Sequence, residues 1–307
     1  MAQFKLACHL IQFEGEERQN PEKVLREVAE AGWEGVEAMP ASSPDELVRV
    51  ATLARRFGLH LVNNLGPGNQ SLESVQYNIT LGNQAAEVPF LWRANYGGDN
   101  PTDADFERAA RSLDDILAFC VTHHVKGFQH AHLGAMIETV EDAERLLAKA
   151  PDLWLLLDTG HMLAAGSDPL RVFKSPTLRN RIAHVHLKDT HADDPTTWNR
   201  RTQKFGQQAR FAELGAGNLG LDVKAVLKNL EEIGFDGWVA VELDRPYPPR
   251  PPAEAARVNR EYLRRIVLTH RTGALKSVSA IPRVGHQTLK PFIGLRLLRR
   301  GTRLPLL

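Results

Sequence analysis

The sequence predicts one α/β domain with the fold of a (β/α)8 barrel, followed by a basic C-terminal tail. Eight short apolar segments rich in Val, Ile, Leu and Phe alternate with longer amphipathic stretches, which is the pattern of repeated βα units. The length of 307 residues accommodates such a barrel, which typically needs about 250 residues. No Gly-x-Gly-x-x-Gly turn follows the first apolar segment, and this weakens the alternative of a doubly wound open sheet.

We expect strands where short apolar runs rich in β-formers occur. In chain order they are residues 4–11, 35–39, 59–64, 88–95, 127–132, 153–158, 181–189 and 237–243. Because parallel strands are joined by right-handed crossovers, eight strands each followed by a helix close naturally into a barrel.

Two of the stretches between the strands carry clear helix signals. The first begins after Ser42 or Ser43, either of which is a suitable N-cap, and stops at Gly58. The second has Thr139 as its N-cap, acidic residues in its first turn, and Pro151 as its terminator. These signals support the alternation of strands and helices on which the barrel prediction depends.

Charge divides the chain into an acidic body, residues 1–270, and a basic tail, residues 271–307. The body holds 30 basic and 37 acidic residues, a net charge of −7, whereas the tail holds eight Lys or Arg and no Asp or Glu. The tail has no clear periodicity, so we interpret it as a loosely ordered appendage. Contact with nucleic acid or an acidic partner is the alternative.

Cysteine usage and hydropathy favour a cytoplasmic setting. Cys8 and Cys120 are far apart in the sequence and provide neither a disulfide framework nor a thiolate metal cluster. No basic segment followed by an apolar one opens the chain, and no run of 18 apolar residues occurs. We therefore expect a protein that is neither exported through a signal peptide nor inserted in a membrane.

Polar side chains gather at the carboxyl ends of the predicted strands, where a barrel builds its active site. The polar residues at or just beyond these ends are Glu37, Asn63, Asn64, His130, His132, Asp158, His161, His184, His186, Lys188, Glu242 and Asp244. A single buried histidine is usually a structural residue. This convergence, however, needs a compensating charge, which a divalent cation supplies.

The expected metal ligands come from four neighbouring strands. Asp158, His186 and Glu242 belong to strands six, seven and eight, and the fifth strand contributes His130, with His132 as the second choice. Imidazole and carboxylate groups without a thiolate suit Mn²⁺, Co²⁺, Zn²⁺ or Mg²⁺. The remaining coordination positions would be open to substrate oxygens.

Residues beside these ligands are expected to act on the substrate. His161 lies three residues beyond Asp158 and is placed to contact substrate. Lys188 is a candidate proton shuttle, because a nearby metal lowers the pKa of an amine. Both have a structural alternative, a turn or helix cap for His161 and an ion pair for Lys188. His184, one step deeper on the same strand face, would orient a metal ligand.

The remaining candidates for substrate binding are Glu37, Asn63, His132 and Arg210. Glu37 has the alternative of a salt bridge inside the barrel mouth. Arg210 belongs to a long segment, residues 190–214, that is either a lid over the substrate or a solvated charged loop. The other lid candidates in this segment are Trp198, Arg200, Arg201 and Lys204.

Four segments carry a resemblance to a known family. They are QHAHLGAMIET (129–139), LLLDTGHMLAAGSDP (155–169), RIAHVHLKD (181–189) and FAELGAGNLGLDVKAVLKNLEEIGFDGWVAVELD (211–244). They resemble the xylose isomerase-like TIM barrels grouped as sugar phosphate isomerases/epimerases, and within that group the inosose dehydratase branch. The resemblance covers most of residues 125–265, while the first 125 residues are similar in layout more than in motif.

The resemblance implies metal-dependent chemistry on a polyhydroxylated ketone, such as an inosose, a keto-sugar or a keto-glycoside, through an enediolate. Asp158, His186 and Glu242 match the family's metal positions and His161 its substrate-contacting histidine, with Mn²⁺ or Co²⁺ as the favoured ions. Most relatives have a glutamate where this chain has His130, and epimerases pair it with the counterpart of Glu242 as acid and base. The histidine therefore favours dehydratase or lyase chemistry over isomerisation or epimerisation.

Two other classes of protein share this barrel. Apurinic endonuclease-like nucleases need a further Asp-x-His pair beyond His186, where this chain reads TTWNRRTQKF (196–205), and an acidic body opposes binding of a polyanion. A non-catalytic sugar-binding barrel would have an incomplete set of ligands. We therefore expect a small polyol ketone or sugar as partner, with no nucleic acid and no membrane. A homo-oligomer is compatible with the sequence.

Overall fold

The computed structural model describes residues 5–64, 66 and 71–278. The chain separates into two compact units, residues 1–266 and 267–307. The first unit contains the described strands, and the described part of the second is the end of a helix that runs to Val278. Residues 271–278 of the predicted tail are thus helical. Residues 279–307 lie outside the described residues, and the boundary at residue 270 stays a prediction.

The strands are β1 (Lys5–His9), β2 (Gly35–Glu37), β3 (His60–Val62), β4 (Ala85–Glu87), β5 (Lys126–His130), β6 (Trp154–Asp158), β7 (Ile182–Leu187), β8 (Asp189–Ala192), β9 (Ala209–Ala212) and β10 (Trp238–Val241). The α-helices are α1 (Glu16–Gln19), α2 (Pro21–Glu30), α3 (Pro44–Arg56), α4 (Leu72–Leu81), α5 (Asp103–Arg111), α6 (Asp114–Thr122), α7 (Val140–Lys149), α8 (Thr159–Ala164), α9 (Val223–Glu232) and α10 (Pro252–Val278). Shorter 3-10 helices are η1 (Leu10–Phe13), η2 (Arg93–Asn95) and η3 (Pro169–Lys174).

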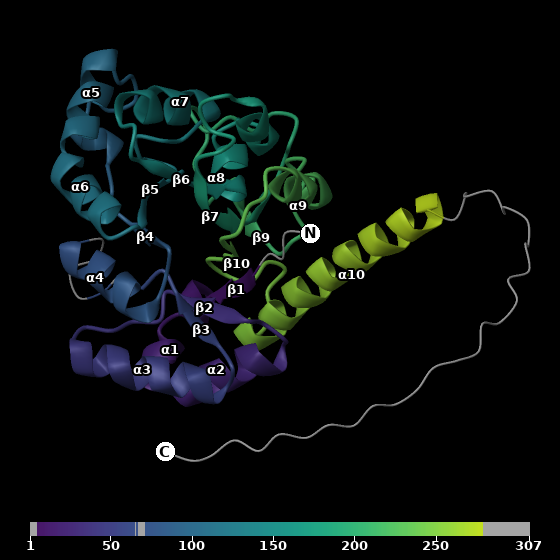
Figure 1. Ribbon diagram of the computed structural model, residues 1–307. Coiled ribbons are helices and arrows are strands. Elements are labelled where there is room, and N and C mark those ends of the chain that lie inside the picture. Colours follow the sequence, from purple (N-terminus) through teal and green to yellow (C-terminus); the bar gives the residue numbers. More distant parts are fainter. Residues whose placement is uncertain (1–4, 65, 67–70, 279–307) are drawn as a thin grey trace, which may run out of the picture. The chain divides into compact units, whose positions relative to one another are not determined.

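Eight of the strands form one parallel sheet in the order β3-β2-β1-β10-β7-β6-β5-β4. Apart from β3 and β4, which stand at the two ends of this order, each strand of the sheet pairs with the next strand of the sheet along the chain, and β1 pairs with β10, the last strand. Helices surround the strands, with α2 and α3 on one side and α5, α6 and α7 on another (Figure 1). The predicted barrel is confirmed, because a doubly wound sheet has a different strand order.

In the described part of the chain, side chains and not a backbone ladder join β3 to β4, the two ends of this order. Asn83 Nδ2 donates to Leu61 O over 3.1 Å, and the backbone N–H of Glu87 donates to Asn63 Oδ1 over 3.2 Å. Asn63 has a left-handed backbone conformation (φ 40°), which asparagine adopts more readily than most residues. Buried amide groups therefore complete this part of the barrel wall.

The fourth strand differs from its prediction. The apolar run 88–95 lies just beyond β4, which is Ala85–Glu87, and includes η2. Its apolar residues have another role, because Val88 and Leu91 are buried while Phe90 and Trp92 line a cavity at the barrel mouth. The correction matters for function, since it makes Glu87 the last residue of a strand.

Side-chain caps explain where the predicted helices begin. Ser43 Oγ accepts the backbone N–H of Glu46 over 3.2 Å at the start of α3, so Ser43 and not Ser42 is the N-cap. Thr139 caps α7 in the predicted way. These caps satisfy backbone donors that the first helical turn leaves without partners.

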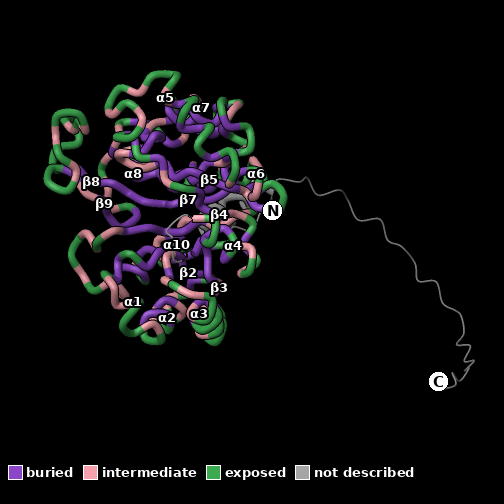
Figure 2. Tube along the Cα trace, turned by 90° about the vertical axis from the view of Figure 1, so that its left-hand side faces the viewer, coloured by how far each residue is buried: buried purple, intermediate pink, exposed green. Residues whose placement is uncertain are grey.

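The interior of the barrel is built from small and apolar side chains below the polar mouth. Ala7, Val62 and Ala240 form one buried cluster, and Phe128 and Leu156 belong to another. The strands are buried, and exposed residues lie on the outer sides of the helices and in the loops (Figure 2). Strands β8 and β9 form a separate antiparallel pair directly after β7. Across the described helices, none is both long and apolar enough to span a membrane.

Candidate metal centre

Four of the predicted ligands converge at the carboxyl ends of neighbouring strands. Their ligand atoms all lie within 4.8 Å of one another, and all four residues are buried. They are His130 on β5, Asp158 on β6, His186 on β7 and Glu242 directly after β10. The strands are adjacent in the sheet, so the barrel topology itself brings together residues that are far apart in the sequence.

Asp158 links this cluster to a helix as well. Its Oδ1 accepts the backbone N–H of His161 over 2.8 Å and so caps α8, while its Oδ2 lies 3.3 Å from His130 Nε2 and 3.6 Å from His186 Nδ1. One carboxylate oxygen therefore fixes the helix and the other faces the two imidazoles. Capping explains why an aspartate suits the last position of β6.

The chemistry of the four side chains fits a divalent cation. His186 Nδ1 and Glu242 Oε2 are 2.6 Å apart, but neither atom has a hydrogen-bond partner. Two imidazoles and two carboxylates form a donor set typical of Mn²⁺, Co²⁺ or Zn²⁺. A cation between them would satisfy both orphaned atoms. His130, Asp158, His186 and Glu242 would hold it.

Glu37 orients His186 from the side away from this cluster. Glu37 is 1% exposed. Its carboxylate lies 3.1 Å from His186 Nε2 and 2.8 Å from His184 Nε2, and it accepts a 2.7 Å hydrogen bond from Asn63 Nδ2. A carboxylate that accepts the second N–H of a histidine fixes the ring and leaves the other nitrogen for a metal. His184 thus contacts Glu37 and reaches the ligand His186 only through it.

A second group of potential ligand atoms, His9, Glu37 and His186, shares one residue with the first. The oxygens of Glu37 already accept hydrogen bonds from Asn63, His184 and His186, and His9 Nδ1 accepts the backbone N–H of Ile11. The first group has two unsatisfied atoms and is therefore the better candidate centre.

Burial and charge set the protonation of the two histidine ligands in opposite directions. Burial lowers the pKa of His130 to about 4, so its imidazole is neutral, as a metal ligand must be. Burial also acts to lower the pKa of His186, but Glu37 and Glu242 outweigh it and raise that pKa well above its ordinary value. The carboxylates that raise the pKa of His186 place negative charge beside it, and His186 would lose its proton on binding a cation.

Lys188 lies beneath the centre and is fully buried. Its Nζ is 3.0 Å from Glu242 Oε1 and 3.0 Å from Asp244 Oδ1, and lies over the Phe211 ring at 3.9 Å. Burial opposes its charge, but Glu242, Asp158 and Asp244 outweigh burial and raise the pKa of Lys188. The carboxylates thus raise the pKa of Lys188, whereas a metal is expected to lower it. A cation that neutralised these carboxylates would lower the pKa of Lys188.

Glycine is required where α8 passes this lysine. A Cβ at Gly160 would lie 2.5 Å from Lys188 Cγ and 2.9 Å from its Cβ. Thr190 Oγ1 donates to Gly160 O over 3.0 Å and holds the two segments together. The glycine of the Asp-Thr-Gly-His segment therefore makes room for the buried lysine stem.

His161 is buried beside Lys188, and both of its ring nitrogens have neighbours. The backbone N–H of Leu133 donates to Nδ1 over 3.2 Å, and Nε2 lies 3.4 Å from Lys188 Nζ. Burial and the charge of Lys188 hold the pKa of His161 well below its ordinary value. Its ring lies 3.8 Å from the ring of His132.

A cavity of about 280 Å³ opens above the centre. It is lined by His9, Ile11, Glu37, Ala38, Asn63, Glu87, Phe90, Trp92, His130, His132, His186 and Glu242. Three predicted residues besides the candidate ligands thus line the cavity: Glu37, Asn63 and His132. His161 and Lys188 stand behind His132 and Glu242 and are not part of this lining.

Arg210 lies apart from the cavity. It is on β9, where its guanidinium pairs with Asp193 over 2.5 Å and lies 5.2 Å from the Tyr247 ring. The segment around it forms the β8–β9 pair and is attached to the barrel at two points. Trp198 Nε1 donates to Ala164 O over 3.0 Å, and Arg200 pairs with Glu138. The role of Arg210 toward substrate stays a prediction.

Sequence reasoning missed six residues of the cavity lining: His9, Ile11, Ala38, Glu87, Phe90 and Trp92. His9 ends β1, so the rule that located the other polar strand ends could have found it. Glu87 was hidden by the misplaced fourth strand. Its Oε1 lies 3.7 Å from His130 Nδ1, which places a further carboxylate in the cavity wall.

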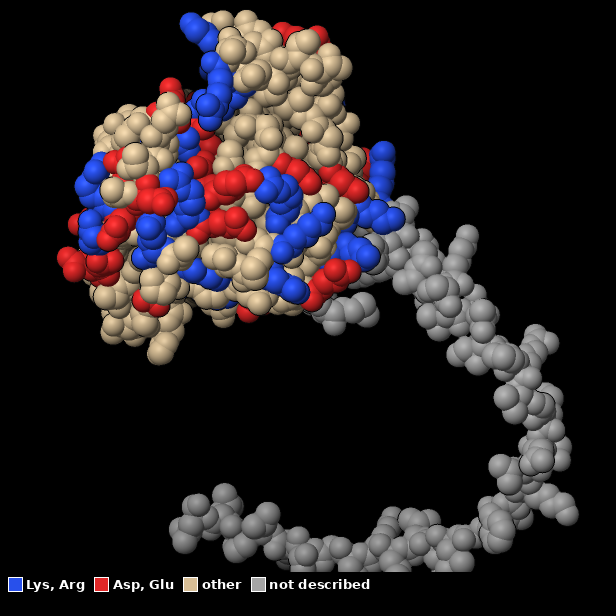
Figure 3. Space-filling model, turned by 90° about the horizontal axis from the view of Figure 1, so that it is seen from above, with Lys and Arg blue, Asp and Glu red and all other residues tan. Residues whose placement is uncertain are grey.

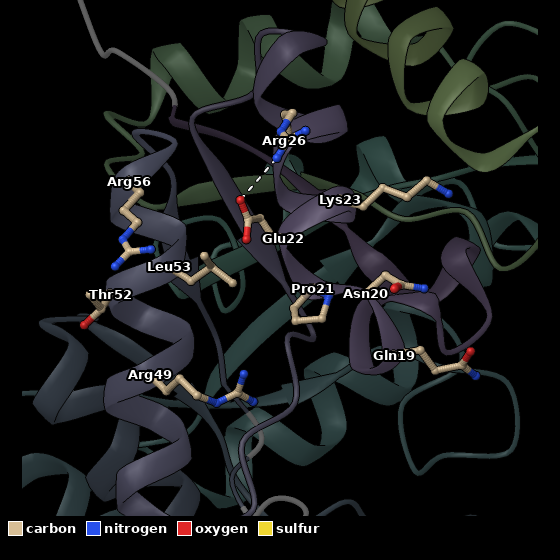
Figure 4. Close-up of a pocket in the computed structure, with 10 residues that line it drawn as sticks. All are labelled: Gln19, Asn20, Pro21, Glu22, Lys23, Arg26, Arg49, Thr52, Leu53 and Arg56. Atoms are coloured by element: carbon tan, nitrogen blue, oxygen red, sulfur yellow. Dashed lines mark hydrogen bonds and ion pairs between the residues drawn. The ribbon is translucent and has the colours of Figure 1, made fainter.

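A larger surface hollow, of about 790 Å³, lies between α2 and α3 (Figure 4). Its lining includes Arg26, which pairs with Glu22 over 3.1 Å, and Arg49, which pairs with Glu46 over 3.4 Å. Paired side chains on the outer faces of helices do not make a catalytic site. The smaller cavity at the strand ends is therefore the candidate site.

Basic and acidic side chains are interspersed over the face of the molecule seen in Figure 3. Elsewhere on the described helices, basic and acidic residues one helical turn apart also form pairs, such as Arg26 with Glu22 and Arg111 with Glu107. A surface that binds a nucleic-acid backbone instead gathers positive charge. This face does not show that feature.

Several inosose dehydratases are similar in sequence to part of the chain. An inosose dehydratase of Clostridium tetani (strain Massachusetts / E88) is 30% identical over 165 residues, which are 53% of this chain and 55% of that protein. An inosose dehydratase of Lacticaseibacillus casei is 29% identical over 192 residues, or 60% of this chain and 63% of that protein. The chain thus spans between half and two thirds of the length of these relatives.

Solved structures share the fold over nearly their whole length. A D-tagatose 3-epimerase-like protein superposes with a TM-score of 0.62 at 16% identity and covers 88% of this chain and 100% of its own. An IOLI protein with a zinc atom has a TM-score of 0.62 at 18% identity and covers 87% and 99%. The family model described as xylose isomerase-like TIM barrel matches residues 25–266. The chain belongs to the xylose isomerase-like TIM barrel family.

Proposed function

We propose that this protein is a divalent-metal-dependent enzyme that removes water or another β-substituent from a polyhydroxylated ketone. The observation that carries the proposal is the convergence of His130, Asp158, His186 and Glu242 within 4.8 Å under an open cavity. The names of the inosose dehydratase relatives support the reaction class. Mn²⁺ or Co²⁺ is the favoured ion, with Mg²⁺ and Zn²⁺ as alternatives.

A cation bound by these residues would supply Lewis acidity that polarises the ketone oxygen and an adjacent hydroxyl. Glu242 is the group placed to take the α-hydrogen as a proton, because its carboxylate lines the cavity. Lys188 donates to Glu242 from behind over 3.0 Å. Burial acts to raise the pKa of Glu242, but Lys188 and His186 outweigh it and hold the pKa well below its ordinary value. The base is therefore ionised.

His161 and Lys188 act on the reaction through the residues in front of them. His132 separates His161 from the cavity, and Glu242 separates Lys188 from it. In this arrangement they are positioning residues, and direct proton transfer to substrate by either would need the cavity wall to move. His9 and His132 are placed to bind substrate hydroxyls, since both line the cavity.

An isomerase or epimerase acting on a ketose is the second candidate. It is favoured by Glu87, which provides a carboxylate in the cavity wall in addition to Glu242. Two carboxylates at one substrate can remove and return a proton on opposite faces. His130 at the fifth-strand position argues against the two-glutamate arrangement of typical epimerases, so we place dehydration first.

Substitution of one carboxylate tests the proposal. Glu242→Gln removes both a metal ligand and the base, and we expect turnover of a ketone substrate to fall by at least about a hundredfold. The far-ultraviolet circular dichroism should be unchanged. Glu213→Gln is the matched control, because Glu213 is a buried carboxylate that pairs with Arg250 and does not line the cavity. Activity of Glu242→Gln within tenfold of the unaltered protein would exclude this site.

The product decides between the two candidate reactions. Inososes, ketohexoses, their phosphates and 3-keto-glycosides are incubated with the protein and each metal in D₂O. A dehydratase gives a product lighter by one water, and a lyase acting on a glycoside releases the aglycone. An epimerase gives a product of unchanged composition with deuterium at the α-carbon, and this result would replace the first proposal by the second.

A further inference from the structure

Two exposed apolar side chains stand at the entrance of the candidate active site. Trp92 is 50% exposed and Ile11 is 44% exposed, and both line the 280 Å³ cavity. Isolated exposed apolar residues need no explanation. Here, however, both line one cavity whose other lining residues include imidazoles and carboxylates. An apolar rim on a polar site indicates a ligand with an apolar part.

Aromatic rings continue from this rim toward the metal centre. The Phe90 and Trp92 ring centroids are 4.4 Å apart, and Phe90 lies edge-on to His132 at 5.4 Å. Phe90 also lies 6.3 Å from the ring of His130, a proposed metal ligand. Phe90 and His132 therefore line the path between a ring bound against Trp92 and the candidate metal centre.

The backbone beneath Trp92 is fixed although its ring is exposed. Trp92 forms an antiparallel bridge with Ala135, and the backbone N–H of Arg93 donates to Gly134 O over 2.8 Å. The buried Arg93 guanidinium donates to Ala135 O over 3.0 Å and pairs with Asp142 over 2.5 Å. The exposed indole is preorganised for stacking, because its backbone is already fixed and ligand binding would cost little conformational entropy.

The volume of the cavity limits which part of a ligand can contact Trp92 and Ile11 at its rim. At about 280 Å³ the cavity lies just below the range of about 300–1,000 Å³ found for small-molecule sites. A single polyhydroxylated ring fits within it, so a group attached to that ring would emerge beside Trp92 and Ile11. Indole faces pack well on the flat faces of aromatic and pyranose rings.

We propose that the substrate is a keto-glycoside, and that Trp92, Phe90 and Ile11 form a subsite for its second ring. The inference rests on the proposed function for the reacting half of the substrate, which lies over the metal centre. The second ring is either an aromatic aglycone or a further sugar, which share the flat apolar face that the indole recognises. A free inosose or ketohexose would leave this subsite empty.

Binding of unreactive glycosides tests the subsite without catalysis. The full chain with Mg²⁺ is titrated with methyl β-D-glucopyranoside, phenyl β-D-glucopyranoside and cellobiose, and saturation-transfer NMR gives each affinity. We expect the phenyl glucoside or cellobiose to bind about threefold to tenfold more tightly than the methyl glucoside, as one aromatic stacking contact provides. Which of the two binds more tightly distinguishes the aromatic aglycone from the sugar.

Variants show whether Trp92 is responsible. Trp92→Ala should abolish the preference for the two-ring probes, Trp92→Phe should keep part of it, and Val121→Ala should keep all of it. Val121 is 52% exposed on α6 and does not line the cavity. Equal binding of all three probes, no binding of any, or a preference that survives in Trp92→Ala would overturn the proposal. A Trp92-dependent preference in a protein that transforms no ketone would instead overturn the proposed function alone.

Discussion

Glu37→Gln tests how the barrel holds its metal ligand. Glu37 is 1% exposed and its two oxygens serve Asn63, His184 and His186 at 2.7, 2.8 and 3.1 Å. The amide that replaces the carboxylate has the same shape but only one acceptor oxygen. Its NH₂ group must then face one of the histidines or Asn63. His186 consequently keeps at most a neutral amide oxygen in place of the carboxylate that fixes its ring.

The magnitude follows from the contacts that are lost. Losing a carboxylate partner of a metal-bound histidine weakens metal binding by about 10- to 100-fold, which is about 1.4–2.7 kcal/mol. The lost charge-assisted hydrogen bond also lowers the free energy of unfolding by about 1.5–3 kcal/mol. For a domain of this size that corresponds to a fall in Tm of roughly 3–12 °C.

The two effects are separated by a matched variant. Glu213→Gln makes the same chemical change at another buried carboxylate, which pairs with Arg250 over 2.8 Å. It should lower Tm but leave metal affinity unchanged. Metal dissociation constants are measured by isothermal titration calorimetry with Mn²⁺ and Tm by differential scanning calorimetry. A Glu37→Gln protein that binds metal within threefold of the unaltered protein would refute the orienting role of Glu37.

Three further outcomes are expected. Gly160→Ala places a methyl group 2.5 Å from Lys188 Cγ, so thermal unfolding should show a loss of about 1–3 kcal/mol; an unchanged Tm would contradict the close packing of α8 on the lysine. Removal of metal with EDTA should lower Tm by roughly 5–10 °C if the metal had been present at about 100 times its dissociation constant. An identical Tm with and without metal would contradict a metal site in the folded protein. Burial raises the pKa of Cys8 to about 12 and of Cys120 to about 11. Both thiols therefore stay protonated at pH 8 and should react with Ellman's reagent only after unfolding. Rapid reaction of the native protein would contradict the burial of these thiols.

The fold and the candidate metal ligands were accessible from the sequence because both follow from local periodicity and strand order. Alternation along β7 places His184 and His186 on one face, and parallel strands bring all carboxyl ends to one end of the barrel. Once seven strands were located, the positions of Asp158 and Glu242 beside His186 followed from strand order alone. Ligand convergence is thus a property of the topology.

Other features depend on tertiary packing, which periodicity does not encode. The run 88–95 is apolar because it forms the cavity wall, so composition alone moved the fourth strand beyond Glu87. Glu37 lines the cavity, where a role toward substrate stays a prediction, and only the structure shows its contacts with Asn63, His184 and His186. Lys188 is on the inward face as predicted, but its burial behind Glu242 depends on Gly160 and Phe211. Contacts between distant segments decide such roles.

The most direct test of the metal centre is anomalous X-ray diffraction from crystals grown with Mn²⁺ or Zn²⁺, recorded on both sides of the metal absorption edge. We predict one strong anomalous peak within about 2.0–2.3 Å of ligand atoms of Asp158, His186 and Glu242, with His130 as the fourth protein ligand. The absence of a peak there, or a peak held by His9 and Glu37 instead, would contradict the proposed centre.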